Sequence, residues 1–146
     1  MQEEIEIEKA KKEDIPSILE LMKDAGLAAE GLEDAELWIM RKNGKVSGSI
    51  GLELWGKQGL LRSLVIAKNE RSKGLGSALV LYVIEQARQS GVNELYLLTD
   101  QVGEYYLRFG FEYFERKKVS GDVLQSSEFR GACLETAPVM RIKLSN

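Results

Sequence analysis

Apolar and polar residues follow two different periods along this chain, and the periods predict an alternation of strands and helices. Ile5 and Ile7 are separated by acidic residues, which is the period of two expected of a strand with one buried face. Residues 12–25 carry apolar side chains three and four positions apart, which predicts a helix that stops before Gly26. The same spacing over residues 75–90 predicts a second long helix.

Shorter apolar runs between these segments complete a pattern of strands connected by turns. Asn43-Gly44 is a strong signal for a two-residue hairpin turn. Residues 103–108 favour a short helix, residues 31–35 a loop or a short helix, and residues 119–131 a polar segment with some helix. Strands are predicted over residues 5–8, 37–41, 46–55, 60–66, 95–98, 111–117 and 139–144. The order predicts one α/β (α+β) domain over residues 1–146.

The most informative segment, residues 69–78, lies between the strand at 60–66 and the helix that follows it. A glycine-rich loop that opens a helix presents free N–H groups and the positive end of the helix dipole to an anion. Gly74 and Gly76 allow the backbone to approach a ligand closely, and Arg71 and Lys73 add positive charge. This pattern predicts a phosphate-binding loop.

Two familiar phosphate-binding motifs do not match this loop. The Walker motif requires a lysine directly after its second glycine, and Gly76 is followed by Ser77. The dinucleotide-binding motif G-x-G-x-x-G requires a third glycine at the position of Leu79. An ordinary glycine-rich turn between a strand and a helix remains the alternative.

Arg71-Ser-Lys-Gly-Leu-Gly76 resembles the pyrophosphate loop of the GNAT N-acetyltransferases, which bind acetyl-coenzyme A. A second segment, Tyr106-Leu-Arg-Phe-Gly-Phe111, resembles the Tyr-x-x-x-Gly-Phe segment of that family. The predicted element order is also similar over nearly the whole chain. The resemblance implies the GNAT fold, a mixed sheet of about six to seven strands flanked by about four helices, with the fourth and fifth strands splayed apart.

Finer details resemble the acetyltransferases associated with arsenic-resistance operons and, more distantly, the acetyltransferase domain of N-acetylglutamate synthases. The segments that carry this likeness are residues 60–65, 96–99, 126–129 and 133–141. Both likenesses imply a small amino-acid-like amine as acceptor, including an organoarsenical amino acid, and a substrate side lined by residues 120–138.

The family resemblance also implies a coenzyme site. Backbone groups of the fourth strand would pair with the pantetheine arm, and a backbone N–H near Val65 or Ile66 would stabilise the thioester oxygen. The family commonly has glycine at the position of Ser72. The implied coenzyme residues are Leu64, Val65 and Ile66 for pantetheine and Arg71, Ser72, Lys73, Gly74, Leu75, Gly76 and Ser77 for the pyrophosphate.

Candidate catalytic residues follow from the chemistry of acetyl transfer. Tyr106, aligned with the family tyrosine, would protonate the departing thiolate, unless it is only a core aromatic. Glu53 is the best side-chain candidate for a base, directly or through water, with a solvent-facing carboxylate as the alternative. Arg62 would clamp an acceptor carboxylate if it faces the cleft and has no role if it faces solvent. Thr99 and Asp100 lie where the acceptor amine should arrive.

Composition narrows the remaining possibilities. The chain has no histidine and one cysteine, Cys133, which excludes histidine-based triads and histidine or cysteine-cluster metal sites, so no metal is expected. The net charge of −3 disfavours nucleic-acid binding. No apolar run approaches ~18 residues and no signal core is present, so a cytoplasmic protein without a membrane partner is expected.

Several alternatives stay open at the level of sequence. The acceptor is a small amino-acid-like amine, or instead the amine of a protein, a polyamine or an aminoglycoside. A non-catalytic sensor that binds acyl-coenzyme A is the alternative from another class of protein. A homodimer is a further option, with residues 139–144 as a candidate pairing strand.

Overall fold

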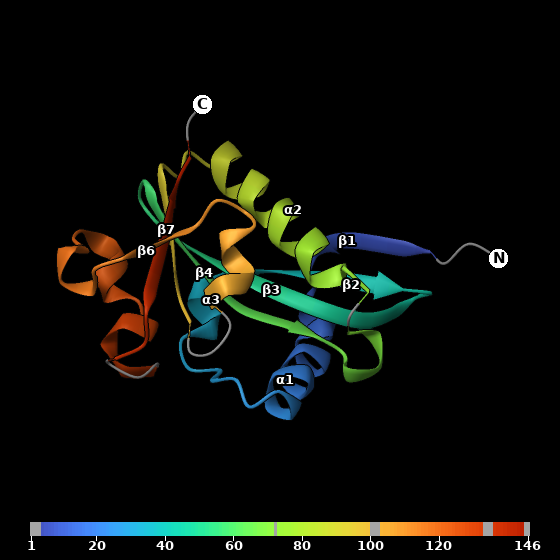
Figure 1. Ribbon diagram of the computed structural model, residues 1–146. Helices are drawn as coiled ribbons and strands as arrows, with labels where there is room; N and C mark the ends of the chain where they lie inside the picture. Colours follow the sequence, from blue (N-terminus) through green and yellow to red (C-terminus); the bar gives the residue numbers. More distant parts are fainter. Residues whose placement is uncertain (1–3, 72, 100–102, 133–135, 145–146) are drawn as a thin grey trace.

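The computed structural model describes residues 4–71, 73–99, 103–132 and 136–144, which form a seven-stranded sheet with helices on both faces (Figure 1). The strand order is β1-β2-β3-β4-β5-β7-β6. Neighbouring strands are antiparallel except for β4 and β5, which are parallel. The strands are β1 (Ile5–Lys9), β2 (Ala35–Lys42), β3 (Lys45–Trp55), β4 (Gln58–Ile66), β5 (Glu94–Leu98), β6 (Glu112–Phe114) and β7 (Val139–Lys143). The predicted fold class is therefore confirmed.

The hairpin between β2 and β3 forms at the predicted turn. Asn43 and Gly44 both have positive φ, at 52° and 82°. Positive φ at both central residues defines the type I′ turn, whose twist matches that of the flanking strands. Asparagine and glycine are the residues that adopt this conformation at least cost, which is why the dipeptide predicts the turn.

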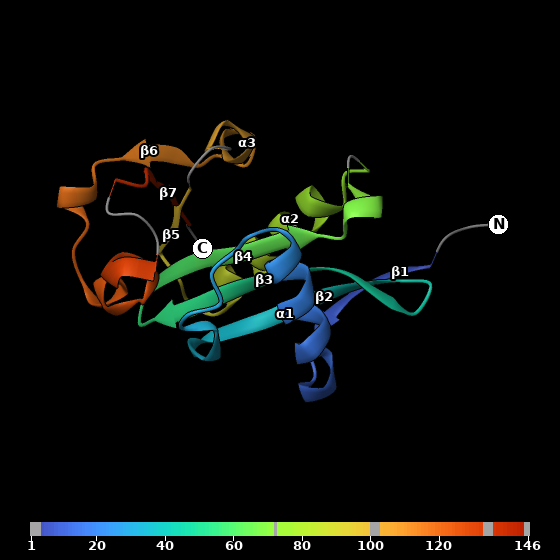
Figure 2. The same cartoon turned by 90° about the horizontal axis from the view of Figure 1, so that it is seen from below.

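The two long helices lie on opposite faces of the sheet (Figures 1 and 2). Helix α1 (Ile15–Asp24) packs Ile18 and Met22 against Ile39 and Val65. Helix α2 (Leu75–Gln89) buries its apolar stripe against the other face, and α3 (Gly103–Leu107) packs on that same side. The residues of the α2 stripe are Leu75, Leu79, Val80, Val83, Ile84 and Ala87. Both helices confirm the predicted periodicity.

Strands β4 and β5 pair over only a short stretch. The paired residues run from Gln58 with Glu94 to Leu60 with Tyr96, and no later residue of β4 pairs with β5 among the described residues. A bulge in β4 lies just beyond this point, because the register opposite β3 shifts between Ser49 and Gly51. Ser63 has φ of 61° within it, a left-handed conformation rare for residues with a side chain. The bulge bends β4, and the splayed strands that the resemblance implied are present.

The strand predicted over residues 111–117 is too long. Strand β6 ends at Phe114, and a 3₁₀ turn follows at Arg116–Lys118. Arg116 donates to the carbonyl oxygens of Ala137 and Phe129, and its guanidinium lies 5.5 Å from the centre of the Phe129 ring. These contacts draw the chain away from the sheet, although the alternation of residue types continues.

The C-terminal part of the chain differs from expectation in one further respect. Strand β7, expected as a site of pairing between copies, lies inside the sheet between β5 and β6. Residues 139–141 have partners on both sides, so this stretch is not a free edge.

The polar segment before β7 contains a 3₁₀ turn (Asp122–Gln125) and a wide helical turn (Glu128–Ala132). Within the described residues, no helix is long and apolar enough to cross a membrane.

Candidate active site

The predicted phosphate loop connects the end of β4 to the start of α2. A 3₁₀ turn (Lys68–Glu70) follows β4, and Gly74 then adopts φ of 78° immediately before the helix begins at Leu75. The N–H of Ala78 is bonded to the carbonyl oxygen of Gly74. Helical geometry leaves the N–H groups of the first turn without intrahelical acceptors, so those of Leu75 to Ser77 can bind an anion.

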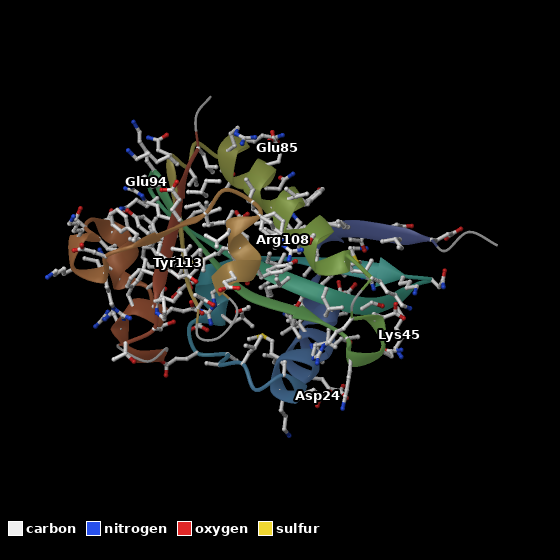
Figure 3. The ribbon with its side chains drawn as sticks, viewed as in Figure 1. Asp24, Lys45, Glu85, Glu94, Arg108 and Tyr113 are labelled. Carbon is white, nitrogen blue, oxygen red and sulfur yellow. The ribbon has the colours of Figure 1, made fainter. Side chains whose placement is uncertain are left out.

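Helix α3 packs directly on this loop. The Ser77 hydroxyl lies 3.0 Å from the Tyr105 hydroxyl, and a Cβ on Gly76 would lie 3.1 Å from that same oxygen. Arg108, labelled in Figure 3, stacks its guanidinium 4.5 Å from the centre of the Tyr105 ring. The small residue at position 76 therefore lets α3 approach the start of α2, which brings the two sequence motifs together.

The charged residues of the loop are held by neighbours. Arg71 Nε donates to the carbonyl oxygen of Ile66 at 3.1 Å. Lys42 donates to Glu70 at 2.6 Å, and Lys73 lies 3.4 Å from the same carboxylate oxygen. The hydrogen bond from Lys42, the largest effect, keeps the pKa of Glu70 below its usual value. Glu70 thus stays ionised and positions Lys73, a role that sequence reasoning missed because Lys42 and Glu70 are distant in the chain.

The three β4 residues expected to meet the pantetheine arm lie beyond the bulge. Val65 pairs with Ser49 and Ile66 pairs with Gly48 on β3, and Leu64 packs against the α2 side of the core. No β5 partner is present for them among the described residues. A strand with one unpaired edge can pair with an amide-bearing ligand, so the geometry fits the expected role.

Tyr106 stands within a cluster of aromatic rings. Its ring centre lies 5.2 Å from that of Tyr105, 6.0 Å from that of Phe111 and 6.5 Å from that of Phe109. Edge-to-face packing of this kind fixes the orientation of the ring and so of its hydroxyl. The side chain is half-buried, and its packing is compatible with both predicted roles.

Glu53 and Arg62 are brought together on the α1 side of the sheet. Their exposed fractions are 1% and 4%, so neither side chain faces solvent. Arg62 Nη1 donates to Glu53 Oε2 at 2.8 Å, and Trp55 Nε1 donates to Glu53 Oε1 at 2.9 Å. The candidate base therefore has both carboxylate oxygens hydrogen-bonded to protein donors, an arrangement that no spacing in the sequence indicates.

Thr99 lies at the end of β5, beside the divergence of the strands. Its N–H donates to the carbonyl oxygen of Pro138, and its buried hydroxyl has no hydrogen-bond partner among the described residues. A buried hydroxyl with its hydrogen-bonding capacity unused is a plausible ligand contact. Ser72, Asp100 and Cys133 lie outside the described residues.

Comparison with known proteins gives the family. The sequence matches the model of the acetyltransferase (GNAT) family over residues 4–111, so the chain belongs to that family. Two amino-acid acetyltransferases of Neisseria meningitidis, from serogroups A and B, are each 26% identical over 119 residues, which covers 74% of this chain and 27% of theirs. The chain thus spans about a quarter of the length of these relatives.

Solved structures agree with the fold. N-acetylglutamate synthase from Neisseria gonorrhoeae, complexed with coenzyme A and N-acetyl-glutamate, superposes with a TM-score of 0.81 at 18% identity. That match covers 98% of this chain and 36% of the synthase. A GNAT acetyltransferase from Staphylococcus aureus Mu50 superposes with a TM-score of 0.75 at 16% identity, covering 97% of this chain and all of its own. The sequence comparison thus gives the family, acetyltransferase (GNAT), and the solved structures give the same fold.

Proposed function

We propose that this protein transfers an acetyl group from acetyl-coenzyme A to the primary amine of a small, amino-acid-like acceptor. The observation that carries the proposal is the divergence of β4 from β5 after Leu60, directly ahead of the Gly74 loop. An unpaired strand edge that leads to an anion-binding helix start suits a ligand with an amide-bearing arm and a pyrophosphate. Coenzyme A has both features.

The coenzyme is assigned to two parts of the site. The N–H groups of Leu75, Gly76 and Ser77 hold the pyrophosphate, with Arg71 and Lys73 supplying charge and Ser72 a further hydroxyl. The backbone of Leu64 to Ile66 pairs with the pantetheine arm. An N–H near Val65 donates to the thioester oxygen as negative charge develops on it, which is worth about 3 kcal/mol in comparable sites.

Acetyl transfer is a direct displacement at the thioester. The neutral amine attacks the carbonyl carbon, a C–N bond forms and the C–S bond breaks. Tyr106 gives its phenolic proton to the departing thiolate. The proton lost by the amine passes to solvent through ordered water, because both carboxylate oxygens of Glu53 already accept hydrogen bonds from Arg62 and Trp55. The amide product leaves with coenzyme A.

An amino-acid-like acceptor is favoured by two considerations. The relatives that match over most of this chain are amino-acid acetyltransferases. The buried Thr99 hydroxyl, which has no hydrogen-bond partner among the described residues, supports an acceptor site at the end of β5, with Asp100 next in the chain. Protein, polyamine and aminoglycoside amines are the competing acceptors, and a sensor that binds acyl-coenzyme A without turnover is the competing class.

Calorimetric titration with acetyl-coenzyme A, run beside a thiol-release assay, tests the proposal. The acceptor panel contains amino acids with L-glutamate among them, an organoarsenical amino acid, polyamines and aminoglycosides. Binding of acetyl-coenzyme A together with thiol release in the presence of an amino acid supports the proposal. Thiol release only in the presence of a polyamine or an aminoglycoside would show that the acceptor is of that class instead. Binding without release on any acceptor favours the sensor, and absence of binding overturns the assignment of the loop.

A further inference from the structure

The guanidinium of Arg62 is the centre of a buried polar cluster on the α1 side of the sheet. Arginine carries five N–H donors in a rigid fork. In this protein each of the three guanidinium nitrogens lies close to two protein oxygens. The contacts are Nε to Ser63 Oγ at 2.9 Å and to Glu128 Oε2 at 3.4 Å, Nη1 to Glu53 Oε2 at 2.8 Å and to Ser127 Oγ at 3.4 Å, and Nη2 to the carbonyl oxygens of Glu30 at 2.8 Å and Ala28 at 3.3 Å.

These contacts join two segments that are far apart in the sequence. The first is the turn after α1, residues 28–31, and the second is the segment after β6, residues 126–128. They also touch each other directly, because Ser127 Oγ donates to the Glu30 carbonyl oxygen at 2.9 Å. A Cβ on Gly31 would lie 2.7 Å from Ser127 Cβ, so no side chain fits between them. Figure 2 shows both segments at the end of β3 where Trp55 lies.

The cluster lies beside the divergence of β4 from β5. Arg62 comes two residues after Leu60, the last residue of β4 that pairs with β5, and directly before the left-handed Ser63. Apolar residues flank it on the same face. Leu32 and Val65 pack with α1 on one side, and Leu60 packs with Val123 on the other. The two segments therefore border the gap between the strands on the face opposite α2.

We propose that Arg62 is a positioning residue, which builds the acceptor side of the site by holding residues 28–31 and 126–128 against β4 and does not itself contact the acceptor. The proposal rests on the acetyl transfer argued above and replaces direct clamping of a carboxylate with an indirect role. Every N–H of Arg62 already has a protein oxygen close enough to accept a hydrogen bond. A substrate carboxylate would have to displace one of these oxygens, which would leave a buried polar group without its partner.

The two roles predict different results when the acceptor and Arg62 are changed together. Kinetics are measured with L-glutamate and with its α-carboxamide, for the wild type, Arg62→Lys and Arg62→Met. A direct contact makes the variants lose more with the acid than with the amide. A positioning role lowers kcat/KM about tenfold or more for both acceptors by the same factor, while the dissociation constant for acetyl-coenzyme A stays unchanged.

Hydrogen exchange gives a readout that does not depend on turnover. In Arg62→Met, amides of residues 28–34 and 122–131 are expected to exchange about tenfold faster or more, because both segments lose their shared anchor. Amides of residues 74–80 should keep wild-type protection. Arg88→Met is the matched control, since Arg88 pairs with Glu85 on the exposed face of α2, and it should change neither segment.

A milder variant keeps the test decisive if Arg62→Met does not fold. Ser127→Ala removes the hydroxyl that contacts both Arg62 and the Glu30 carbonyl oxygen, and it should raise the acceptor KM and the exchange of both segments to a smaller extent. Unchanged exchange in every variant, or a loss confined to the acid, overturns the positioning role. Failure of the wild type to bind acetyl-coenzyme A would instead overturn the proposed function, so the two failures are distinguishable.

Discussion

Gly74→Ala is the sharpest test of the coenzyme loop, because its physical effect is a backbone effect alone. Gly74 has φ of 78°, and a Cβ built on it meets no atom within 4 Å. The substitution therefore adds no clash, only the cost of holding an L-residue in the left-handed region, roughly 1–2 kcal/mol. No packed neighbour forces that conformation on an alanine, so the loop can relax in the free protein.

Binding of the coenzyme then has to restore the left-handed turn that points the N–H groups at the pyrophosphate. A penalty of 1–2 kcal/mol corresponds to roughly a 5- to 30-fold weaker affinity for acetyl-coenzyme A. Gly44→Ala is the matched control, because Gly44 has φ of 82°, also meets no atom within 4 Å, and lies in the β2–β3 hairpin. It should lower stability, by about 3–8 °C in Tm, without changing the affinity.

Calorimetry of both variants with acetyl-coenzyme A, beside thermal unfolding, separates the two effects. Gly74→Asn should recover part of the lost affinity, because asparagine tolerates positive φ better than alanine does. Equal affinities of Gly74→Ala and Gly44→Ala would refute the reasoning, since the turn at Gly74 would then have no part in holding the coenzyme.

Three further substitutions test separate parts of the molecule. Tyr106→Phe should bind acetyl-coenzyme A normally and lose about 100-fold or more in kcat, and unchanged turnover in the thiol-release assay would remove the acid role. Glu70→Gln tests the ion pair with Lys42: because the pKa of Glu70 is lowered on folding, the pair stabilises above the usual carboxylate pKa and that contribution is lost as pH falls through the lowered value. Urea unfolding should therefore show a wild-type advantage at neutral pH that disappears in acid, whereas a constant difference would contradict the pairing. Gly31→Ala should lower the free energy of unfolding by about 3 kcal/mol or more, because Gly31 has φ of 76° and a Cβ there would collide with Ser127. A urea midpoint near that of Gly44→Ala would show that residues 28–31 and 126–128 are not in close contact.

The features that the sequence predicts well are those decided by a few neighbouring residues. The turn at Asn43-Gly44 follows from the conformations these two residues adopt, and α2 follows from its apolar spacing and the glycine before it. The position of the Gly74 turn between β4 and α2 follows from local signals of the same kind. Local chemistry is enough in each case.

The features that the sequence does not predict depend on residues far apart in the chain. The pairing of Glu53 with Arg62 requires the register of β3 against β4, which sets Leu60 opposite Glu53 and Gly51 opposite Arg62 and so makes the two charged side chains diagonal neighbours. The carbonyl oxygens of Ala28 and Glu30 carry no side-chain signal at all. The early end of β6 depends on contacts of Arg116 with residues 129 and 137, which alternation cannot reveal.

The position of β7 between β5 and β6 has a consequence for the order in which the molecule assembles. Strand β5 pairs with β4 over three residues only, and its longest pairing, from Glu94 to Leu98, is with β7. Residues 99–138 separate these two strands, so closing that loop costs entropy before the pairing returns any free energy. During synthesis, β1 to β4 and α2 can pack as soon as they emerge, whereas β5 stays weakly held until residues 139–143 arrive. The side of the gap formed by β5 is therefore expected to become rigid only when β7 joins the sheet.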